Sequence, residues 1–160
     1  MYNLYFIVVL QSIKISERNL YKKIVVGYDG SENSERALER AIELASESGA
    51  KVRIVTVTDN ASFILAQDAE IYSKLLEEAK ERARHIQLSA LAKLENSGVK
   101  VEGEILEGSP ANAILSSASE FKADLIVVGR RGVRGLKRFL IGSVSSAIVS
   151  NSKCDVLVVK

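Results

Sequence analysis

The sequence is poor in the residues that build redox, metal and multi-histidine catalytic sites. Its 160 residues include one cysteine, Cys154, one histidine, His85, and no tryptophan. One cysteine excludes an intramolecular disulfide and a site of several thiolates, and one histidine excludes multi-histidine metal binding. A lone thiol is compatible with a reducing cytosol, so the expected location is cytoplasmic. We expect His85 to lie on the surface and Cys154 to be a small buried or interface residue rather than a nucleophile.

A strong net charge and a long apolar run are also absent. The net charge is only +2, which by itself favours neither a nucleic-acid partner nor a membrane surface. The apolar run Leu4–Leu10 is far shorter than the roughly 20 residues of a membrane span, and it lacks the features of a secretory signal. We expect residues 1–20 to be an N-terminal arm or an extra edge strand. The alternative is a segment that covers a partner's surface in an oligomer.

The composition of the sequence suits one soluble globular domain beginning near Tyr21. The hydrophobic fraction is 47% and the charged fraction 26%, which is enough apolar material for a core without disulfides. Apolar runs that predict strands alternate with patterns of helical spacing that predict helices. The predicted strands are 23–27, 52–57, 99–106, 125–128 and 156–159. The predicted helices are 31–49, 62–96 (as one helix or two), 109–121 and 143–150.

This alternation predicts an α/β fold, a Rossmann-like five-stranded parallel sheet with helices on both faces. The strand at 99–106 alternates apolar and polar residues, so we expect it near a sheet edge. Ser31 is the expected N-cap of the first helix, and Gly49 its C-terminal glycine. Ser109-Pro110 is a second helix start, because proline at the first helical position loses no hydrogen bond.

Two segments follow strands whose carboxyl ends should form the binding crevice of such a sheet, Gly27–Ser31 and Gly129–Ser143. In the second, glycines without a Cβ let the backbone approach a ligand, and Gly142-Ser143 open a helix whose N–H groups favour phosphate. This stretch has no acid between Gly129 and Gly142. It holds five bases: Arg130, Arg131, Arg134, Lys137 and Arg138. An anionic ligand would offset that charge.

The spacing Gly129-x2-Gly132-x9-Gly142-Ser143 resembles the nucleotide signature of the universal stress protein family, in its ATP-binding branch. The stretches Lys23–Ser31 and Cys154–Lys160 also resemble that family's first and last strands. The resemblance covers residues 21–160. It implies an adenine nucleotide alpha hydrolase-like fold, ATP as the ligand, and a homodimer formed through the last strand.

The resemblance also implies roles for individual residues. Asp29 would lie beside the nucleoside, and Val57 would line the adenine. The remaining expected binding residues surround the ribose and phosphates or end the two strands: Gly27, Tyr28, Val128, Gly129, Arg130, Gly132, Gly142, Ser143, Val144 and Ser145. A Mg²⁺ or Mn²⁺ ion bridging the phosphates is compatible with the resemblance, although no cluster of carboxylates in the loop marks a metal site held by the protein.

Several alternatives stay open from the residues alone. Asp29 could simply stabilise the following helix, Ser143 could be a plain N-cap, and the basic loop could be a solvated turn or a nucleic-acid patch. We favour a nucleotide-dependent binding or regulatory module in the stress response, with no catalytic residue assigned. Its partners would be the adenine nucleotide and an unidentified protein, with no nucleic acid and no membrane. The rival functions are a slow ATP hydrolase or phosphotransferase, and a nucleotide-free dimerisation module.

Overall fold

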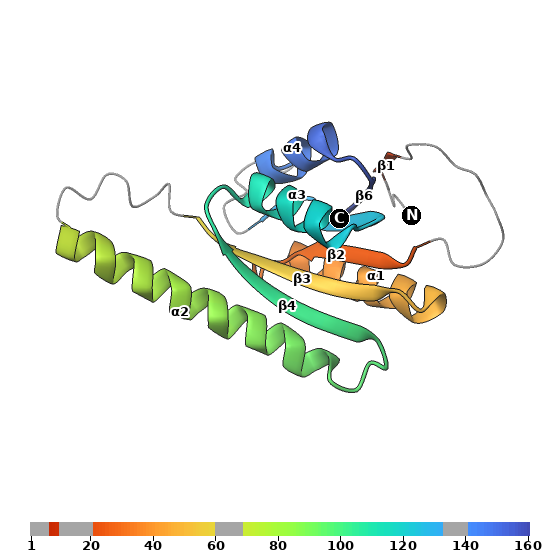
Figure 1. Cartoon of the computed structure of the whole chain (residues 1–160), viewed down its shortest axis with the longest axis horizontal. Helices are drawn as coiled ribbons and strands as arrows, with labels where there is room; N and C mark the ends of the chain where they lie inside the picture. Colours follow the sequence, from red (N-terminus) through yellow and green to blue (C-terminus); the bar gives the residue numbers. More distant parts are fainter. Residues whose placement is uncertain (1–6, 10–20, 60–68, 133–140) are drawn as a thin grey trace, which may run out of the picture.

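The computed structural model describes residues 7–9, 21–59, 69–132 and 141–160. In this part of the chain, a twisted sheet lies between two layers of helices (Figure 1). The strands are β1 (Ile7–Val9), β2 (Lys23–Gly27), β3 (Lys51–Thr58), β4 (Lys100–Glu107), β5 (Leu125–Gly129) and β6 (Asp155–Val159). The helices are α1 (Glu32–Ser48), α2 (Ala69–Leu94), α3 (Pro110–Phe121) and α4 (Ser143–Asn151).

The strand order is β1-β6-β5-β2-β3-β4, and β2 to β6 form the predicted five-stranded parallel sheet. From β2 the chain adds β3 and β4 on one side and then crosses to β5 on the other. The reversal therefore falls between β2 and β5, where Gly27 is paired with Val128. In sheets of this kind, the carboxyl ends of the two central strands diverge at the reversal and leave a crevice.

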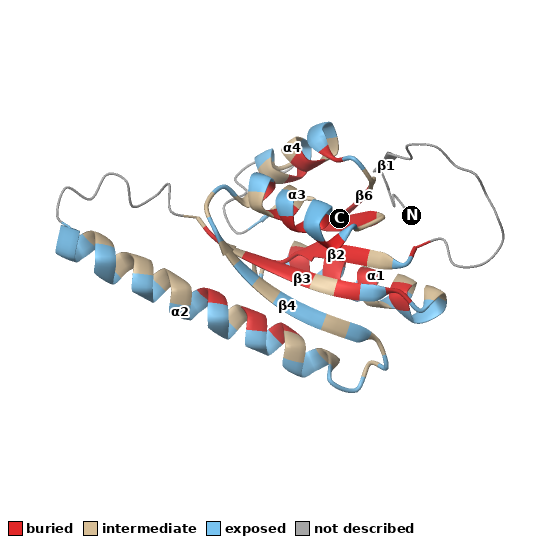
Figure 2. Cartoon of the chain, viewed as in Figure 1, coloured by how far each residue is buried: buried red, intermediate tan, exposed pale blue. Residues whose placement is uncertain are grey.

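Each face of the sheet has its own hydrophobic core, and each core is covered by two helices. Ile54 of β3 belongs to the core under α1 and α2, whereas its neighbour Val55 belongs to the core under α3 and α4. This division follows from the two-residue period of strands, which sends successive side chains to opposite faces. The strands β2, β5 and β6 are buried almost throughout (Figure 2). Burial on both faces explains their continuous apolar sequences.

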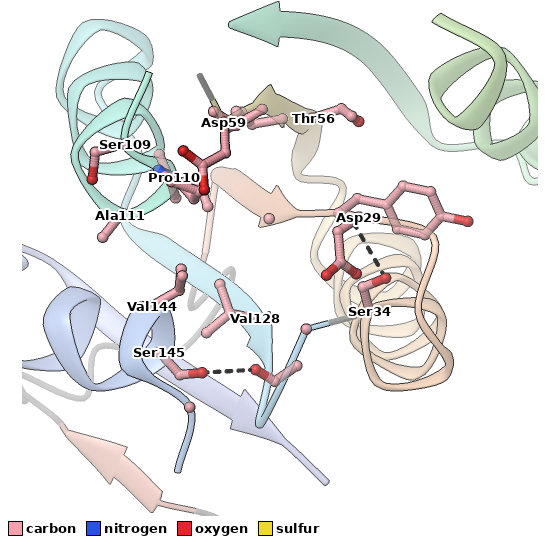
Figure 3. Close-up of a pocket in the computed structure, with 18 of the residues that line it drawn as sticks. Asp29, Ser34, Thr56, Asp59, Ser109, Pro110, Ala111, Val128, Val144 and Ser145 are labelled. Carbon is pink, nitrogen blue, oxygen red and sulfur yellow. Dashed lines mark hydrogen bonds between the residues drawn. The ribbon is translucent and has the colours of Figure 1, made fainter. Parts of the chain in front are cut away.

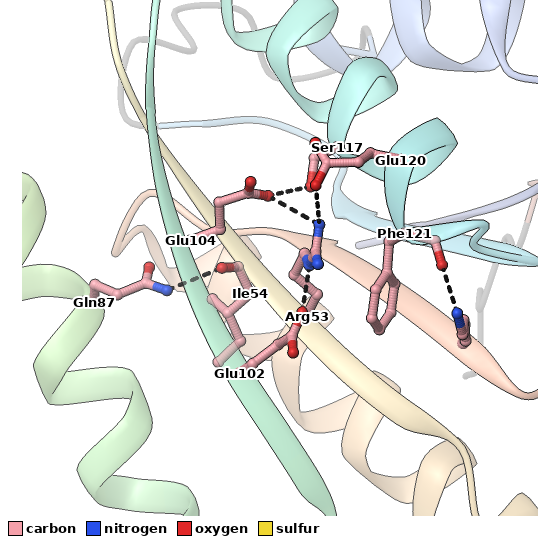
Figure 4. Close-up of polar contacts among 9 residues, drawn as sticks. Arg53, Ile54, Gln87, Glu102, Glu104, Ser117, Glu120 and Phe121 are labelled. Carbon is pink, nitrogen blue, oxygen red and sulfur yellow. Dashed lines mark hydrogen bonds and ion pairs between the residues drawn. The ribbon is translucent and has the colours of Figure 1, made fainter.

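Strand β4 is the far edge of the sheet, as its alternating sequence predicts, and most of its residues are exposed or half-buried. Arg53 of β3 joins this edge to α3. Its Nε lies 2.6 Å from Glu102 Oε1, its Nη1 lies 3.5 Å from Glu104 Oε2, and its guanidinium is 4.3 Å from the centre of the Phe121 ring (Figure 4). A planar guanidinium suits this combination of carboxylates and an aromatic face.

The short strand β1 pairs antiparallel with β6, with Ile7 opposite Val158 and Val9 opposite Val156. It therefore extends the sheet beyond the five parallel strands on the β6 side. The rest of residues 1–20 lies outside the described part of the chain. So does the beginning of the predicted helix 62–96, of which α2 is the described portion.

The helix ends largely match the sequence signals. Ser31 is the N-cap of α1, and its hydroxyl accepts a hydrogen bond from the Ser34 amide. Gly49 closes α1 in the left-handed conformation, with φ 71°. Ser109 occupies the N-cap position of α3, but its side chain makes no capping hydrogen bond. Gly142, and not Ser143, is the N-cap of α4, so the alternative in which Ser143 is a plain N-cap is wrong.

None of the helices in the described ranges is both long and apolar enough to cross a bilayer. His85 is exposed on α2, as expected. Cys154 is half-buried just before β6, and burial raises the pKa of its thiol. A raised pKa leaves less thiolate at neutral pH, which fits the expectation that Cys154 is not a nucleophile.

Candidate functional site

A cavity of about 950 Å³ opens at the carboxyl ends of the central strands. Its walls come from the ends of β2, β3 and β5, the amino ends of α3 and α4, and one face of α2. Figure 3 shows Asp29 on one side, Ser109 to Ala111 and Val144 on the other, and Val128 between them. The cavity thus lies at the reversal of strand order, where ligands of open α/β sheets bind. Its volume is within the roughly 300–1,000 Å³ typical of small-molecule sites.

The carboxylate of Asp29 is held in place at the end of β2. Its Oδ1 accepts a hydrogen bond of 3.0 Å from the Ser31 amide, and its own amide donates to Ser34 Oγ at 3.4 Å. A Cβ added at Gly132 would overlap Asp29 Oδ2, so the glycine at 132 leaves space for this carboxylate. Asp29 therefore supports the start of α1 and also lines the cavity. The two interpretations of Asp29 from the sequence are both compatible with this geometry.

Gly129 serves a packing role that the motif alone does not reveal. A Cβ at this position would lie 2.7 Å from both the carbonyl carbon and the oxygen of Asn33, in the first turn of α1. Real Cβ atoms do not come so close to backbone atoms, so only glycine lets α1 cross β5 at this distance. Gly129 also lines the cavity. Its missing side chain thus fixes the position of α1 against the site.

The amino end of α4 opens into the cavity without a side-chain cap. Its N-cap Gly142 has no side chain to accept from the first-turn amides, and Ser143, the first helical residue, is exposed. The Gly142 amide donates to the Arg130 oxygen at 2.8 Å. This bond joins the two ends of the segment Gly129–Ser143, which we call the glycine loop. Ser145 Oγ lies 3.0 Å from the oxygens of both Gly129 and Arg130, so this hydroxyl is committed to the loop. The first-turn amides and the helix dipole remain directed at the cavity.

Every predicted binding residue except Arg130 lines the cavity. The Arg130 amide donates to the Val159 oxygen at 2.6 Å, and its carbonyl accepts from Gly142, so its backbone ties β5, β6 and α4 together. Arg131, the next residue, lines the cavity in its place. The other three bases of the loop, Arg134, Lys137 and Arg138, lie outside the described residues.

Tyr28 is almost fully buried beside Asp29, and its hydroxyl donates to Glu35 Oε1. Burial and this hydrogen bond raise the pKa of Tyr28 well above its usual range, so the phenol stays protonated at neutral pH. Burial acts to raise the pKa of Glu35 as well. Hydrogen bonds from Lys93 and Tyr28 outweigh that effect and hold the pKa of Glu35 below its usual value. Glu35 is therefore ionised, and it links the site to α2 through Lys93.

Sequence reasoning missed two walls of the cavity. One is contributed by α2, through Ala79, Arg82, Ala83 and Ile86, and the other by the first turns of α3. Ala79, Ala83 and Ile86 belong to the apolar stripe by which α2 was predicted, but such a stripe does not distinguish core contacts from a cavity wall. At α3, the Ser109-Pro110 signal predicted where the helix begins, but it did not show that the first turns of this helix face the cavity.

The described residues contain no group of three or more His, Cys, Asp or Glu side chains that could hold a metal ion. Among the described residues that line the cavity, the carboxylates are Asp29 and Asp59, which follow different strands, β2 and β3. Figure 3 shows the two on different sides of the site. These residues do not fit a metal held by protein ligands alone, since Mg²⁺ and Mn²⁺ prefer several oxygen ligands at once. An ion here would need most of its ligands from the bound molecule.

Comparisons with known proteins agree on one family. The model of the universal stress protein family matches residues 20–160. A universal stress protein of Methanocaldococcus jannaschii is 44% identical over 156 residues, covering 95% of this chain and 89% of that protein. The UspA structure from Lactobacillus plantarum has a TM-score of 0.74 at 27% identity, covering 91% of this chain and all (100%) of that one.

A second solved structure shows a universal stress protein in complex with cAMP. It is 34% identical to this chain, with a TM-score of 0.66, and the match covers 88% of this chain and 97% of that one. The match to the family model includes all five parallel strands and the residues that line the cavity. The chain therefore belongs to the universal stress protein family.

Proposed function

We propose that this protein binds ATP in the cavity between β2 and β5 and acts as a nucleotide-dependent regulatory module in the stress response. The observation that supports this most directly is the amino end of α4. Its first-turn amides have no side-chain cap and open into a cavity of suitable size. Such a helix end is a favourable environment for phosphate, because amide donors and the positive end of the dipole coincide there.

The rest of the cavity fits a nucleoside. Val57 and Val128, at the ends of β3 and β5, provide apolar walls for a base, and Asp29 provides acceptors for ribose hydroxyls or the base. The likeness to the cAMP complex supports an adenine nucleotide as the ligand class. ATP, rather than a monophosphate, is proposed because the glycine loop is so strongly basic. A divalent ion bound with ATP would be coordinated by its phosphates.

Titration calorimetry of the purified full chain with ATP tests this proposal. We expect saturable binding at one site per chain, with weaker binding of AMP because it lacks the β- and γ-phosphates. GTP serves as the control for the base. Absence of both heat and thermal stabilisation at millimolar ATP would show that the cavity does not bind ATP.

We also propose that the chain forms a homodimer through β6 when β1 leaves the outer edge of that strand, so that the N-terminus competes with the partner chain. One edge of β6 pairs with β5, and β1 occupies the other edge opposite Val156–Val158. Because a strand has only two edges, β1 and a partner's strand cannot pair with the same residues at once.

Removing residues 1–20 should therefore expose the outer edge of β6 and shift the chain from monomer towards dimer. Sedimentation equilibrium of the full chain and of residues 21–160, at matched concentrations, measures this. If the deletion instead caused an existing dimer to dissociate, residues 1–20 would be a segment that binds the partner. Identical oligomeric states would show that β1 does not control this edge.

A further inference from the structure

We propose that Gln87 is a positioning residue for ligand binding, which holds α2 at the register that makes the α2 wall of the cavity. This inference rests on the proposed function, because it concerns the same cavity. Gln87 does not line the cavity itself. It acts through the neighbouring residues of α2, one turn nearer the amino end of the helix.

The side chain of Gln87 is a buried polar anchor between α2 and β3. Gln87 is only 4% exposed. Its Nε2 donates to the Ile54 oxygen at 2.9 Å (Figure 4). Its Oε1 accepts a hydrogen bond from the hydroxyl of Thr56. The amide therefore satisfies one backbone and one side-chain group of the same strand. Because donor and acceptor lie on opposite sides of the amide, the two bonds fix the side chain both along β3 and in rotation.

Strand β4 leaves room for this side chain at Gly103, which has no side chain of its own. Gln87 reaches β3 across β4 at Gly103, which is paired with Ile54. A Cβ at Gly103 would overlap Gln87 Nε2 and lie 3.0 Å from Leu91 Cδ1. Glycine otherwise weakens a strand interior, and here its missing side chain allows the close approach of another residue. The contact between Gln87 and β3 therefore requires glycine at position 103.

This anchor lies directly behind the cavity. Thr56, which donates to Gln87, itself lines the cavity, and so do Ile86, next to Gln87 in the sequence, and Ala83, one turn earlier on α2. The Ile86 side chain also lies close to Gly30 in the turn that follows Asp29, where an added Cβ would be 3.5 Å from it. A shift of α2 along β3 would thus move the wall beside Asp29, the nucleoside side in the proposed function, while the α4 end of the cavity would stay in place.

Few side chains of α2 are fully buried. The helix has 26 residues, and of these only Ala83, Gln87 and Ala90 are buried. Its ion pairs to other elements, Lys80 with Glu107 and Lys93 with Glu35, each join a half-buried side chain to an exposed one, so water partly screens both pairs. Buried hydrogen bonds are not screened in this way, and removing one partner leaves the other unsatisfied.

The test compares two ligands in Gln87→Leu, which keeps the bulk of the side chain but removes both hydrogen bonds. Calorimetry with ATP and with inorganic tripolyphosphate separates the base end of the cavity from the phosphate end. We expect ATP to bind about 10-fold more weakly, the size of effect that a lost buried hydrogen bond can produce, with tripolyphosphate affinity changed by less than about 2-fold. Arg84→Ala, which removes ion pairs to Glu77 and Glu81 on the exposed face of α2, is the matched control and should leave both affinities unchanged.

Two further measurements cover the cases in which Gln87→Leu folds poorly or wild type does not bind. Gly103→Ala should weaken ATP binding in the wild-type background but add little to Gln87→Ala, because the contact that remains is with the flexible end of Leu91. Hydrogen exchange without ligand should become faster over residues 79–90 in Gln87→Leu and stay the same over α4.

These outcomes distinguish the two proposals. If wild type bound neither ATP nor tripolyphosphate, the proposed function would fail, and so would the role of Gln87 in binding. If wild type bound ATP but Gln87→Leu weakened both ligands equally, or neither, Gln87 would not position the base-side wall. Additive losses in Gln87→Ala and Gly103→Ala, or unchanged exchange over residues 79–90, would overturn the inference without affecting the ATP proposal.

Discussion

Replacing Gly129 with alanine is expected to destabilise the fold by about 3 kcal/mol, at the upper end of the range for overpacking. The added methyl would meet the carbonyl carbon and oxygen of Asn33 at 2.7 Å. Those atoms belong to the backbone of α1, so they cannot turn away as the end of a side chain would. Relief requires the whole amino end of α1 to move off β5. In urea unfolding, the midpoint should fall by about 1.5 M if the free energy of unfolding decreases by about 2 kcal/mol per molar urea.

Gly98→Ala is the control, because Gly98 has a left-handed backbone conformation but free space around it, whereas Gly129 has backbone atoms close by. Gly98 has φ 72°, and an added Cβ would meet nothing within 4 Å. Its substitution therefore incurs only the conformational penalty of the left-handed region, about 1 kcal/mol. A larger loss of stability in Gly98→Ala than in Gly129→Ala would mean that the contact with Asn33 does not constrain the fold.

Replacing Gly142 with valine is expected to weaken ATP binding about 100-fold, which corresponds to about 2.7 kcal/mol of binding free energy. From the sequence alone, the reason would be that a side chain blocks the approach of phosphate. The structure adds a second reason. A Cβ at this position would lie 3.2 Å from the Arg130 oxygen and 3.4 Å from the Arg131 Cα. The branched side chain would therefore push the amino end of α4 away from the glycine loop.

Gly142 does not need to be glycine for its backbone conformation. Its φ of −66° and ψ of 159° are open to any residue. The fold should therefore lose only about 1 kcal/mol in Gly142→Val, the difference between a good and a poor N-cap residue. Gly142→Ala, which adds the Cβ alone, should show an intermediate loss of ATP affinity in calorimetry. Unchanged affinity in Gly142→Val would remove this loop from the nucleotide site.

Local signals in the sequence predicted much of the secondary structure, because the interactions behind them are local. A serine oxygen reaches an amide three residues away, so Ser31 could be recognised as the N-cap of α1. The left-handed conformation of Gly49 follows equally from its own lack of a Cβ. Continuous apolar runs identified the buried strands because burial on both faces requires them. The crevice between Gly27 and Val128 then followed from general rules for α/β sheets.

The glycine loop shows which contacts could not be predicted from the sequence. Its spacing correctly indicated a segment beside the cavity, and the resemblance of the motif indicated the family. It did not show that Gly129 makes room for α1, that Gly132 makes room for Asp29, or that Arg131 rather than Arg130 lines the cavity. Which of two adjacent arginines faces a cavity depends on how the backbone leaves β5. That path is fixed by contacts with Val159 and Gly142, both distant in the sequence.

The sequence by itself determined the element order, the parallel sheet and the segments that meet at its carboxyl edge, since these follow from periodicity, capping and chain connectivity. Only the tertiary structure decided that α2 forms one wall of the cavity and that β1 adds to the outer edge of β6. It alone placed Gln87 across Gly103. These features depend on the register between elements far apart in the chain, and register is set by the matching of side-chain shapes and hydrogen-bonding groups across the sheet.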